Sequence, residues 1–358
     1  MIKVLVVDDS ALARKLLVQV FAAEADFEVE VARDGVEALD RLQTFAPDVV
    51  TLDIHMPQMD GLACLDRIMI ERPCPVVMVS SQTAEGAETA LEALRLGAVD
   101  FIAKPSGAVS LRIGEMAPAL VEKVRAAAGA KLRSSLRLKE RVRHRMGGGA
   151  TSAHPRITET AGPAMEAATG DGLVLVGTST GGPPALEALL TALPADFPWP
   201  ILVAQHMPAT FTGPLARRLD RICALTVMEV LKPALLQPGC VYIGRGDADL
   251  IVSRRAAGLT ALVAPPEAYP WHPSADRLVR SAMEQLPASQ LIGVLMTGMG
   301  DDGAAAMANL HADGGRTIAE AAETAVVWGM PGELVKAGGA DAVLPLHKIA
   351  AHLLSLVP

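Results

Sequence analysis

Aromatic residues are scarce in this chain. Phe, Trp and Tyr make up only 3% of its 358 residues, whereas apolar residues make up 51%. The interior must therefore be built from aliphatic side chains and alanine. A chain of this length is expected to form about two domains, each large enough to bury a core of its own.

Cysteine, long apolar runs and excess positive charge are also missing. The four cysteines form no Cys-x-x-Cys pair and no metal-ligand spacing, which is typical of a protein in a reducing cytoplasm. No run approaches the ~18 apolar residues of a membrane span, and Asp8 and Asp9 break the first run, so we expect neither membrane insertion nor a signal peptide. The net charge of −8 argues against a general nucleic-acid binder.

Short aliphatic runs alternate with helical patterns in both halves, which predicts an α/β protein with two doubly wound parallel sheets. We expect one domain over residues 1–120, a linker over 121–170 and a second domain over 171–358. The linker contains the basic stretch 131–145 and then a stretch too polar to bury a core. We favour a solvated linker, and the alternative is a basic segment that docks on acidic partner surfaces.

A serine follows one of these aliphatic runs in the second half. Ser179 lies in Gly177-Thr178-Ser179-Thr180-Gly181-Gly182, after the run 173–176. The glycines allow a sharp turn that exposes the serine Oγ, and Pro183-Pro184 suits the first turn of a following helix. The positive end of that helix would stabilise an oxyanion at the serine. The motif indicates a serine hydrolase, although a phosphate-binding glycine loop or an ordinary strand-to-helix turn can have the same short sequence.

A serine nucleophile needs a base and a group that orients the base. His206 and Asp302 lie beyond the aliphatic runs 201–204 and 291–295. The three side chains would therefore meet where the carboxyl ends of parallel strands share one edge. The chain order Ser, His, Asp differs from three common triad orders, but the same geometry can arise on another topology.

Spacing leaves two alternatives open. His272 competes with His206 as the base, and it lies in a loop that leads into a helix with Ser274 as a possible N-cap. Asp301 competes with Asp302 as the orienting group.

Acidic side chains end strands of the first half. Asp8 and Asp9 follow the run 3–7 and Asp53 ends the run 48–52, while Ser80 and Lys104 end two later runs. Three carboxylates at one sheet edge repel each other unless a divalent cation joins them, and hard oxygen ligands suit Mg²⁺. The lysine and the hydroxyl would stabilise a phosphoryl group on Asp53.

The first third of the chain resembles the response-regulator receiver domain. The resemblance implies phosphorylation at Asp53, with Mg²⁺ held by Asp9, Asp53 and the backbone carbonyl of His55 and with Asp8 assisting through water. His55 stands where glutamate or asparagine is usual. Phe101, near Lys104, is expected to change its packing with the state of Asp53. The matching pieces are Asp8-Asp9, the stretch 53–61, Ser80 and the stretch 97–105.

The second half resembles the catalytic domain of the chemotaxis protein-glutamate methylesterases. The resemblance implies Ser179 as nucleophile, His206 as base and Asp302 as orienting group, and it leaves His272 as a neighbour of the site. Thr180 and the backbone N–H of Met299 would line the oxyanion site. The matching stretches are residues 177–182, 205–208, 272–276, 297–303 and 329–331.

The two resemblances together predict a phosphorylation-controlled serine esterase. It would hydrolyse glutamyl γ-methyl esters on the cytoplasmic domains of chemoreceptors and deamidate receptor glutamines. A chemotaxis sensor histidine kinase would be the phosphodonor, Mg²⁺ would serve the receiver, and the catalytic domain would need no cofactor. The unphosphorylated receiver is expected to cover the active site.

Two other classes remain open. One is a phosphorylation-dependent binding module without chemistry, and the other is a glycine-rich nucleotide-binding domain. The lack of a Gly-Lys-Ser/Thr ending weighs against the nucleotide-binding class.

Overall fold

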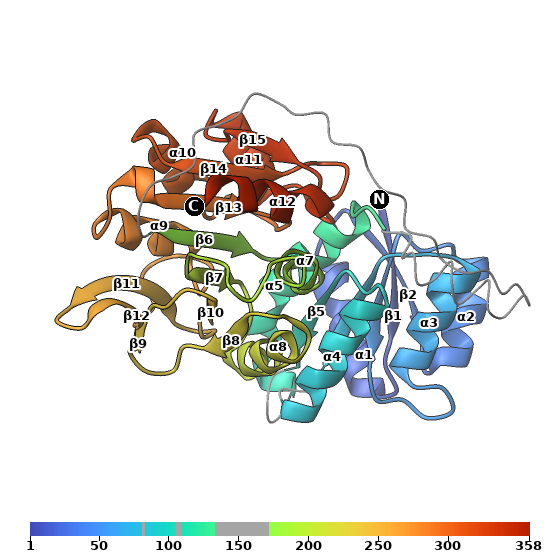
Figure 1. Ribbon diagram of the computed structural model, residues 1–358. Helices are drawn as coiled ribbons and strands as arrows, with labels where there is room; N and C mark the ends of the chain where they lie inside the picture. Colours follow the sequence, from blue (N-terminus) through green and yellow to red (C-terminus); the bar gives the residue numbers. More distant parts are fainter. Residues whose placement is uncertain (81–82, 105–108, 133–171) are drawn as a thin grey trace, which may run out of the picture.

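Two parallel sheets form the framework of the chain (Figure 1). The computed structural model describes residues 1–80, 83–104, 109–132 and 172–358. Each sheet is covered by helices on both faces, so the expected pair of doubly wound α/β units is confirmed. Within the described part of the chain, no helix combines the length and apolar character that crossing a membrane requires.

The first sheet has the strand order β2-β1-β3-β4-β5, and all its strand pairs are parallel. This is the flavodoxin-like order. Its strands are β1 (Ile2–Val7), β2 (Phe27–Ala32), β3 (Val49–Asp53), β4 (Val76–Ser80) and β5 (Asp100–Ala103). Its helices are α1 (Ala11–Ala22), α2 (Gly35–Thr44), α3 (Gly61–Glu71), α4 (Ala84–Leu96) and α5 (Val109–Ala128).

Alternation along the strands divides the first core into two layers. Leu5 and Val7 face the helices α2, α3 and α4, whereas Val4 and Val6 face α1 and α5. Strands buried on both faces are apolar at nearly every position, which explains the continuous aliphatic run at the start of the chain.

The helix α5 extends beyond the boundary expected from the sequence. The first domain was expected to end at residue 120, but α5 continues to Ala128. Val124 and Ala127 are fully buried in the layer with α1, so these turns belong to the core of the first domain. The remainder of the expected linker, residues 133–170, lies outside the described residues.

The second sheet is parallel throughout and has the order β15-β14-β13-β6-β7-β10-β8. A small antiparallel sheet, β11-β12-β9, packs beside it. The strands are β6 (Leu173–Thr178), β7 (Ile201–Gln205), β8 (Thr226–Glu229), β9 (Ala234–Leu235), β10 (Cys240–Ile243), β11 (Asp249–Arg255), β12 (Gly258–Ala264), β13 (Leu291–Leu295), β14 (Arg316–Glu320) and β15 (Ala342–Leu344).

The helices of the second domain form two layers. α7, α8 and α12 cover one face of the large sheet, and α9, α10 and α11 cover the other together with the small sheet. They are α7 (Gly182–Leu190), α8 (Ala209–Ile222), α9 (Ala275–Met283), the 3₁₀ helix η1 (Ala288–Gln290), α10 (Ala304–Ala312), α11 (Met330–Lys336) and α12 (Leu346–Leu356).

The chain adds strands to the second sheet first on one side of β6 and then on the other. From β6 it adds β7, β8 and β10 on one side, and it then crosses back to add β13, β14 and β15 on the other. The carboxyl ends of β6 and β13 therefore border a topological switch point, where loops leave in opposite directions. Sites in open parallel sheets form at such a crevice.

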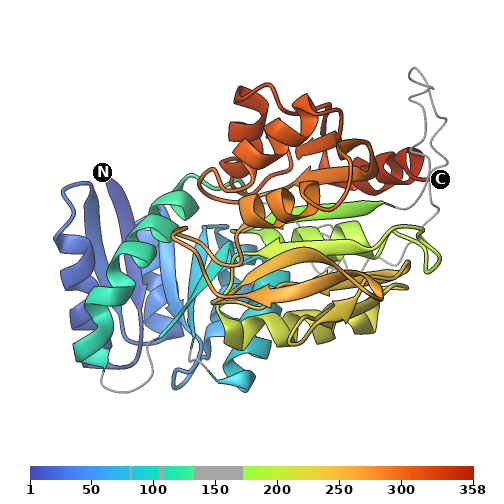
Figure 2. The same cartoon turned by 90° about the vertical axis from the view of Figure 1, so that its left-hand side faces the viewer.

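The two domains pack directly against each other (Figures 1 and 2). Helix α4 of the first domain lies against α7 and α8 of the second. The rings of Phe101 and Phe211 meet across the boundary with their centroids 4.3 Å apart. Arg218 on α8 pairs with Glu187 on α7 and with Glu92 on α4, so the contact has both an apolar and an ionic part.

Candidate active site

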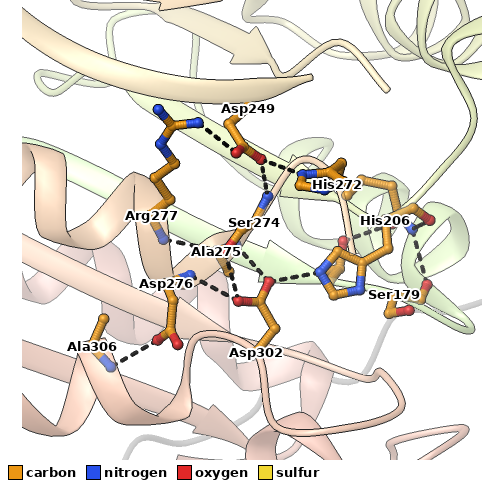
Figure 3. Close-up of polar contacts among 12 residues, drawn as sticks. Ser179, His206, Asp249, His272, Ser274, Ala275, Asp276, Arg277, Asp302 and Ala306 are labelled. Atoms are coloured by element: carbon orange, nitrogen blue, oxygen red, sulfur yellow. Dashed lines mark hydrogen bonds and ion pairs between the residues drawn. The ribbon is translucent and has the colours of Figure 1, made fainter. Parts of the chain in front are cut away.

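Three neighbouring strands of the second sheet carry the predicted hydrolase residues. Ser179 follows β6 and His206 follows β7, and these strands are paired from Val174↔Ile201 to Thr178↔Gln205. Asp302 lies in the loop after β13, which pairs with the other side of β6. The structure thus brings all three residues to the carboxyl edge at the switch point (Figure 3).

A tight turn carries Ser179 from the strand into α7. Gly181 has a φ of +76°, and a Cβ added there would lie 2.8 Å from Cβ of Val326. Only glycine suits this position, because any other residue would strain the left-handed backbone and clash with Val326. The Ser179 carbonyl accepts hydrogen bonds from Gly182 N and Gln205 Nε2, at 2.8 and 3.0 Å. The proline-led helix α7 begins where the sequence indicated.

His206 lies between Ser179 and Asp302 (Figure 3). Its Nε2 is 2.7 Å from Oδ2 of Asp302. Its Nδ1 is buried and has no hydrogen-bond partner within the described residues. The nitrogen left for proton transfer is therefore Nδ1, on the side of the ring nearer Ser179, and such contacts tighten when substrate binds.

Asp302 is only 4% exposed, and its carboxylate is held by several donors. Besides His206, it accepts hydrogen bonds from the Ser274 hydroxyl at 2.8 Å and from the backbone N–H groups of Ala275 and Asp276 at 2.6 and 3.1 Å. Burial by itself would raise the pKa of Asp302, but these hydrogen bonds and the charge of His206 outweigh it, and the pKa lies below its usual value. Asp302 is therefore a charged acceptor that fixes the imidazole.

The two alternatives left by the spacing make other contacts than His206 and Asp302 do. Asp301 is exposed, and it is Asp302 that contacts His206. His272 borders the same cavity as Ser179, but its Nδ1 is paired with Oδ1 of Asp249 at 2.9 Å. Ser274 is the N-cap of α9, as the sequence suggested.

Asp249 was not found by sequence reasoning. It begins β11 in the small antiparallel sheet, so no strand-end pattern connects it with the active site. Its buried carboxylate accepts from His272, Ser274 N and Arg277. Burial would raise its pKa, but these hydrogen bonds lower it by more, and the pKa lies below the ordinary aspartate value.

The active-site cavity lies between the two domains. It has a volume of about 530 Å³. Ser179, His206 and Met299 line it, together with Lys123 and other residues of β5 and α5. The loop between β12 and α9 reaches toward α5 at this point (Figure 2). Trp271 in that loop stacks on the ring of His206, with the centroids 5.8 Å apart and the planes within 8°.

A first-domain carboxylate contacts a residue predicted to line the oxyanion site. The hydroxyl of Thr180 donates to Oδ2 of Asp100 at 2.5 Å. The other oxygen of Asp100 accepts from Lys123 Nζ and from Phe101 N. Sequence reasoning did not find Asp100, because no pattern within one domain reveals a contact between two.

The acidic edge of the first sheet has the predicted composition. Ligand oxygens of Asp8, Asp9 and Asp53 lie within 4.8 Å of one another. Lys104 Nζ bridges two of them, at 2.9 Å from Asp8 and 2.8 Å from Asp53. Burial raises the pKa of Asp53 by more than Lys104 lowers it, so this pKa lies above its usual value.

The remaining first-domain residues are placed as follows. His55 is exposed in the loop after β3. Ser80 ends β4, and its side chain lies outside the described part. Phe101 is buried against Phe211 of the second domain, next to the contact that Asp100 makes.

The fold, the acidic cluster at the edge of the first sheet and the Ser-His-Asp group at the edge of the second define a class of protein. It is a response regulator whose second domain is a hydrolase. Family models for the response regulator receiver domain and for the CheB methylesterase match residues 4–113 and 174–353. The chain belongs to the CheB methylesterase family.

Relatives with established names support this membership. The chain is 58% identical to protein-glutamate methylesterase/protein-glutamine glutaminase 2 of Rhodopseudomonas palustris, over 99% of this chain and 98% of the relative. It is 45% identical to the protein of the same description from Caldanaerobacter subterraneus, over 99% and 96%. The solved CheB methylesterase catalytic domain of Thermotoga maritima matches with a TM-score of 0.51 and 38% identity, covering 53% of this chain and all of that one.

We predict that Asp302→Asn lowers the rate of the hydrolytic step by about 10⁴, as loss of the orienting carboxylate does in other triads. The variant should also make the free energy of unfolding depend less on pH in acid solution. The folded pKa of Asp302 is lowered, so its stabilisation is complete above the unfolded value of about 4 and is lost as the pH falls through the folded pKa.

Two measurements check this prediction. Steady-state rates are compared with those of Asp301→Asn, which alters the exposed neighbour. Urea unfolding at several pH values should show the stability gap between the wild type and Asp302→Asn shrinking below about pH 4. A gap that stays constant with pH, or an equal loss of rate in Asp301→Asn, would contradict the assignment.

Proposed function

We propose that the chain is a serine esterase that hydrolyses glutamyl γ-methyl esters of chemoreceptors and also converts receptor glutamines to glutamates. The observation that carries the proposal is the His206 imidazole, fixed by the buried Asp302 on one side and open to Ser179 on the other. The relatives named for both activities cover nearly the full chain.

The geometry suggests the order of proton transfers. Ser179 Oγ attacks the γ-carbonyl carbon while Nδ1 of His206 takes the hydroxyl proton. Nδ1 then protonates the leaving methoxy or amino group, so methanol or ammonia departs and a glutamyl ester of Ser179 remains. A water molecule, deprotonated by the same nitrogen, hydrolyses this ester to glutamate and restores the serine.

The negative charge of the tetrahedral intermediate would form beside Thr180, the Met299 backbone N–H and the first turn of α7. Helix N-termini and backbone donors that are already oriented stabilise such a charge without further rearrangement. Trp271, stacked on His206, would limit the access of water to the base.

Control by the first domain belongs to the same proposal. Asp53 is the phosphorylation site, and Lys104 would neutralise charge on the phosphoryl group. The oxygens of Asp8, Asp9 and Asp53 fit Mg²⁺, with His55 supplying a carbonyl. When bound, the ion would offset the charge of the carboxylates and the phosphoryl group. A chemotaxis sensor kinase would be the phosphodonor.

In the unphosphorylated state, β5 and α5 would restrict entry to the cavity. The Asp100–Thr180 hydrogen bond and the Phe101–Phe211 contact support this part of the proposal. Phosphorylation would shift an existing equilibrium away from this covered state. The four cysteines are all free thiols, which fits the proposed cytoplasmic location.

The proposed esterase activity is tested by methanol release from methylated receptor domains. Ser179→Ala should abolish release because it removes the attacking oxygen, and His206→Ala should show a similar loss without adding to it in the double variant. Ser355→Ala is the control, since that hydroxyl is exposed and bonds only within its own helix. Methanol release by Ser179→Ala at the wild-type rate would refute the assignment.

The phosphorylation site is tested by phosphoryl transfer from a sensor histidine kinase. The wild type should be labelled in the presence of Mg²⁺, whereas Asp53→Asn should not be labelled because it lacks the acceptor carboxylate. Asp40→Asn, at an exposed position of α2, is the matched control. Labelling that persists in Asp53→Asn or in EDTA would count against the site.

Inhibition by the first domain is tested with two proteins. Asp100→Ala removes the interdomain hydrogen bond to Thr180, worth about 1 kcal/mol, together with the contacts of Asp100 to Lys123 and Phe101 N within the first domain. Loss of the interdomain bond should raise the unphosphorylated rate roughly fivefold. A fragment starting near residue 170 should be more active than the unphosphorylated full chain and indifferent to phosphodonor. Asp40→Ala should change nothing. Equal rates for the fragment and the unphosphorylated chain would exclude inhibition.

A further inference from the structure

A second histidine–aspartate pair borders the active-site cavity. His272 lies in the loop before α9 and lines the same cavity as Ser179, His206 and Met299. Its side chain is 19% exposed, while that of its partner Asp249 is fully buried. The mechanism derived above assigns neither residue a step.

The contacts of Asp249 determine which nitrogen of His272 carries a hydrogen. Oδ1 accepts from His272 Nδ1 at 2.9 Å and from Ser274 N at 2.9 Å. Oδ2 accepts from Arg277 Nη1 at 2.7 Å and from Glu267 N at 3.3 Å. An ionised carboxylate only accepts hydrogen bonds, so Nδ1 of His272 must be the donor.

The opposite nitrogen of the ring is then available to a ligand. In a neutral imidazole with its hydrogen on Nδ1, Nε2 is a hydrogen-bond acceptor. Within the described residues, the hydrogen bond of the His272 ring is made by Nδ1. Arg277 Nη1 pairs with Oδ2, the other carboxylate oxygen of Asp249, at 2.7 Å. The neutral form of His272 therefore offers an acceptor nitrogen at the cavity that Ser179 also lines.

The two substrates of the proposed function differ in whether they can donate a hydrogen bond to such an acceptor. A glutamine side chain carries an NH₂ group with two hydrogens to donate, whereas the methoxy oxygen of a methyl ester has none. We propose that Nε2 of His272 accepts a hydrogen bond from the substrate carboxamide, so that His272 determines specificity for deamidation over demethylation. This inference rests on the proposed dual activity.

The contact requires no new covalent step. Ser179 forms the bond to the carbonyl carbon, and His206 delivers the proton with which the carboxamide nitrogen leaves as ammonia. Nε2 of His272 accepts a hydrogen bond from an N–H of that carboxamide nitrogen, and the His272 ring neither gains nor loses a proton. Asp249 acts through His272 and is a positioning residue, because it sets the orientation and the tautomer of the ring.

The test uses the full chain with a small-molecule phosphodonor. Two forms of one chemoreceptor cytoplasmic domain carry either glutamine or the glutamyl methyl ester at the same position. Ammonia and methanol release give kcat/KM for each substrate. Enzyme concentrations are set by titration with a covalent serine probe, so that any misfolded fraction does not enter the rates.

The main variant is His272→Asn, whose side-chain amide can still donate to Asp249 but has no atom in the place of Nε2. Its kcat/KM for deamidation should fall about tenfold further than its kcat/KM for demethylation. His272→Gln extends a carbonyl oxygen toward the vacated position and should recover part of the loss. His347→Asn, at an exposed position of α12, is the control and should leave the ratio unchanged.

Three results would overturn the inference. Equal losses for the two substrates would show that His272 only supports the structure. A larger loss of demethylation would show that the ring donates to the leaving oxygen instead. A wild-type enzyme that releases methanol but no ammonia would leave the esterase in place and remove the deamidation role. If it releases neither product, the proposed function itself fails.

Discussion

The N-terminal turn of α9 is the element on which the arrangement of the catalytic edge depends. A buried carboxylate is costly unless hydrogen bonds replace its hydration. The backbone N–H groups of Ala275 and Asp276 begin the helix and therefore have no carbonyl partner within it. They provide that replacement by donating to Asp302. The Ser274 hydroxyl adds a third donor, so one oxygen of Asp302 remains directed at His206. The imidazole is thus fixed before any substrate arrives.

The same turn connects the two histidines of the cavity. Ser274 donates its backbone N–H to Asp249 and its hydroxyl to Asp302, so one residue contacts the carboxylate partners of both rings. A displacement of this turn would therefore disturb His206 and His272 together. This connection explains why a comparison of two substrates is more informative about His272 than any single rate.

Sequence patterns predict the residues of this site that follow parallel strands. Ser179, His206 and Asp302 were found because the carboxyl ends of neighbouring strands meet, and the register of β13, β6 and β7 brings them together. The choice between Asp301 and Asp302 depends on which carboxylate reaches the turn of α9, and spacing does not contain that information. Asp249 comes from an antiparallel sheet, and Asp100 comes from the other domain. Neither position has a local pattern that marks it.

The extent of α5 illustrates a different limit. The sequence beyond residue 120 becomes richer in charge and alanine, which favours a linker interpretation. The structure continues the helix because Val124 and Ala127 fall on the face that covers the first sheet. A helical pattern and a linker composition can coexist over two turns, and packing against a neighbouring sheet then decides between them.

The short strand β5 joins the two chemical sites of the molecule. Lys104, directly after β5, pairs with Asp53 and Asp8, while Asp100, its first residue, binds Thr180 beside the nucleophile. Phe101 lies between them and packs on Phe211. A strand rises about 3.3 Å per residue, so roughly 13 Å of backbone separates Asp100 from Lys104. A change in how Lys104 is held can therefore act on the Thr180 contact through one rigid element. No chain of contacts through the core of either domain is required.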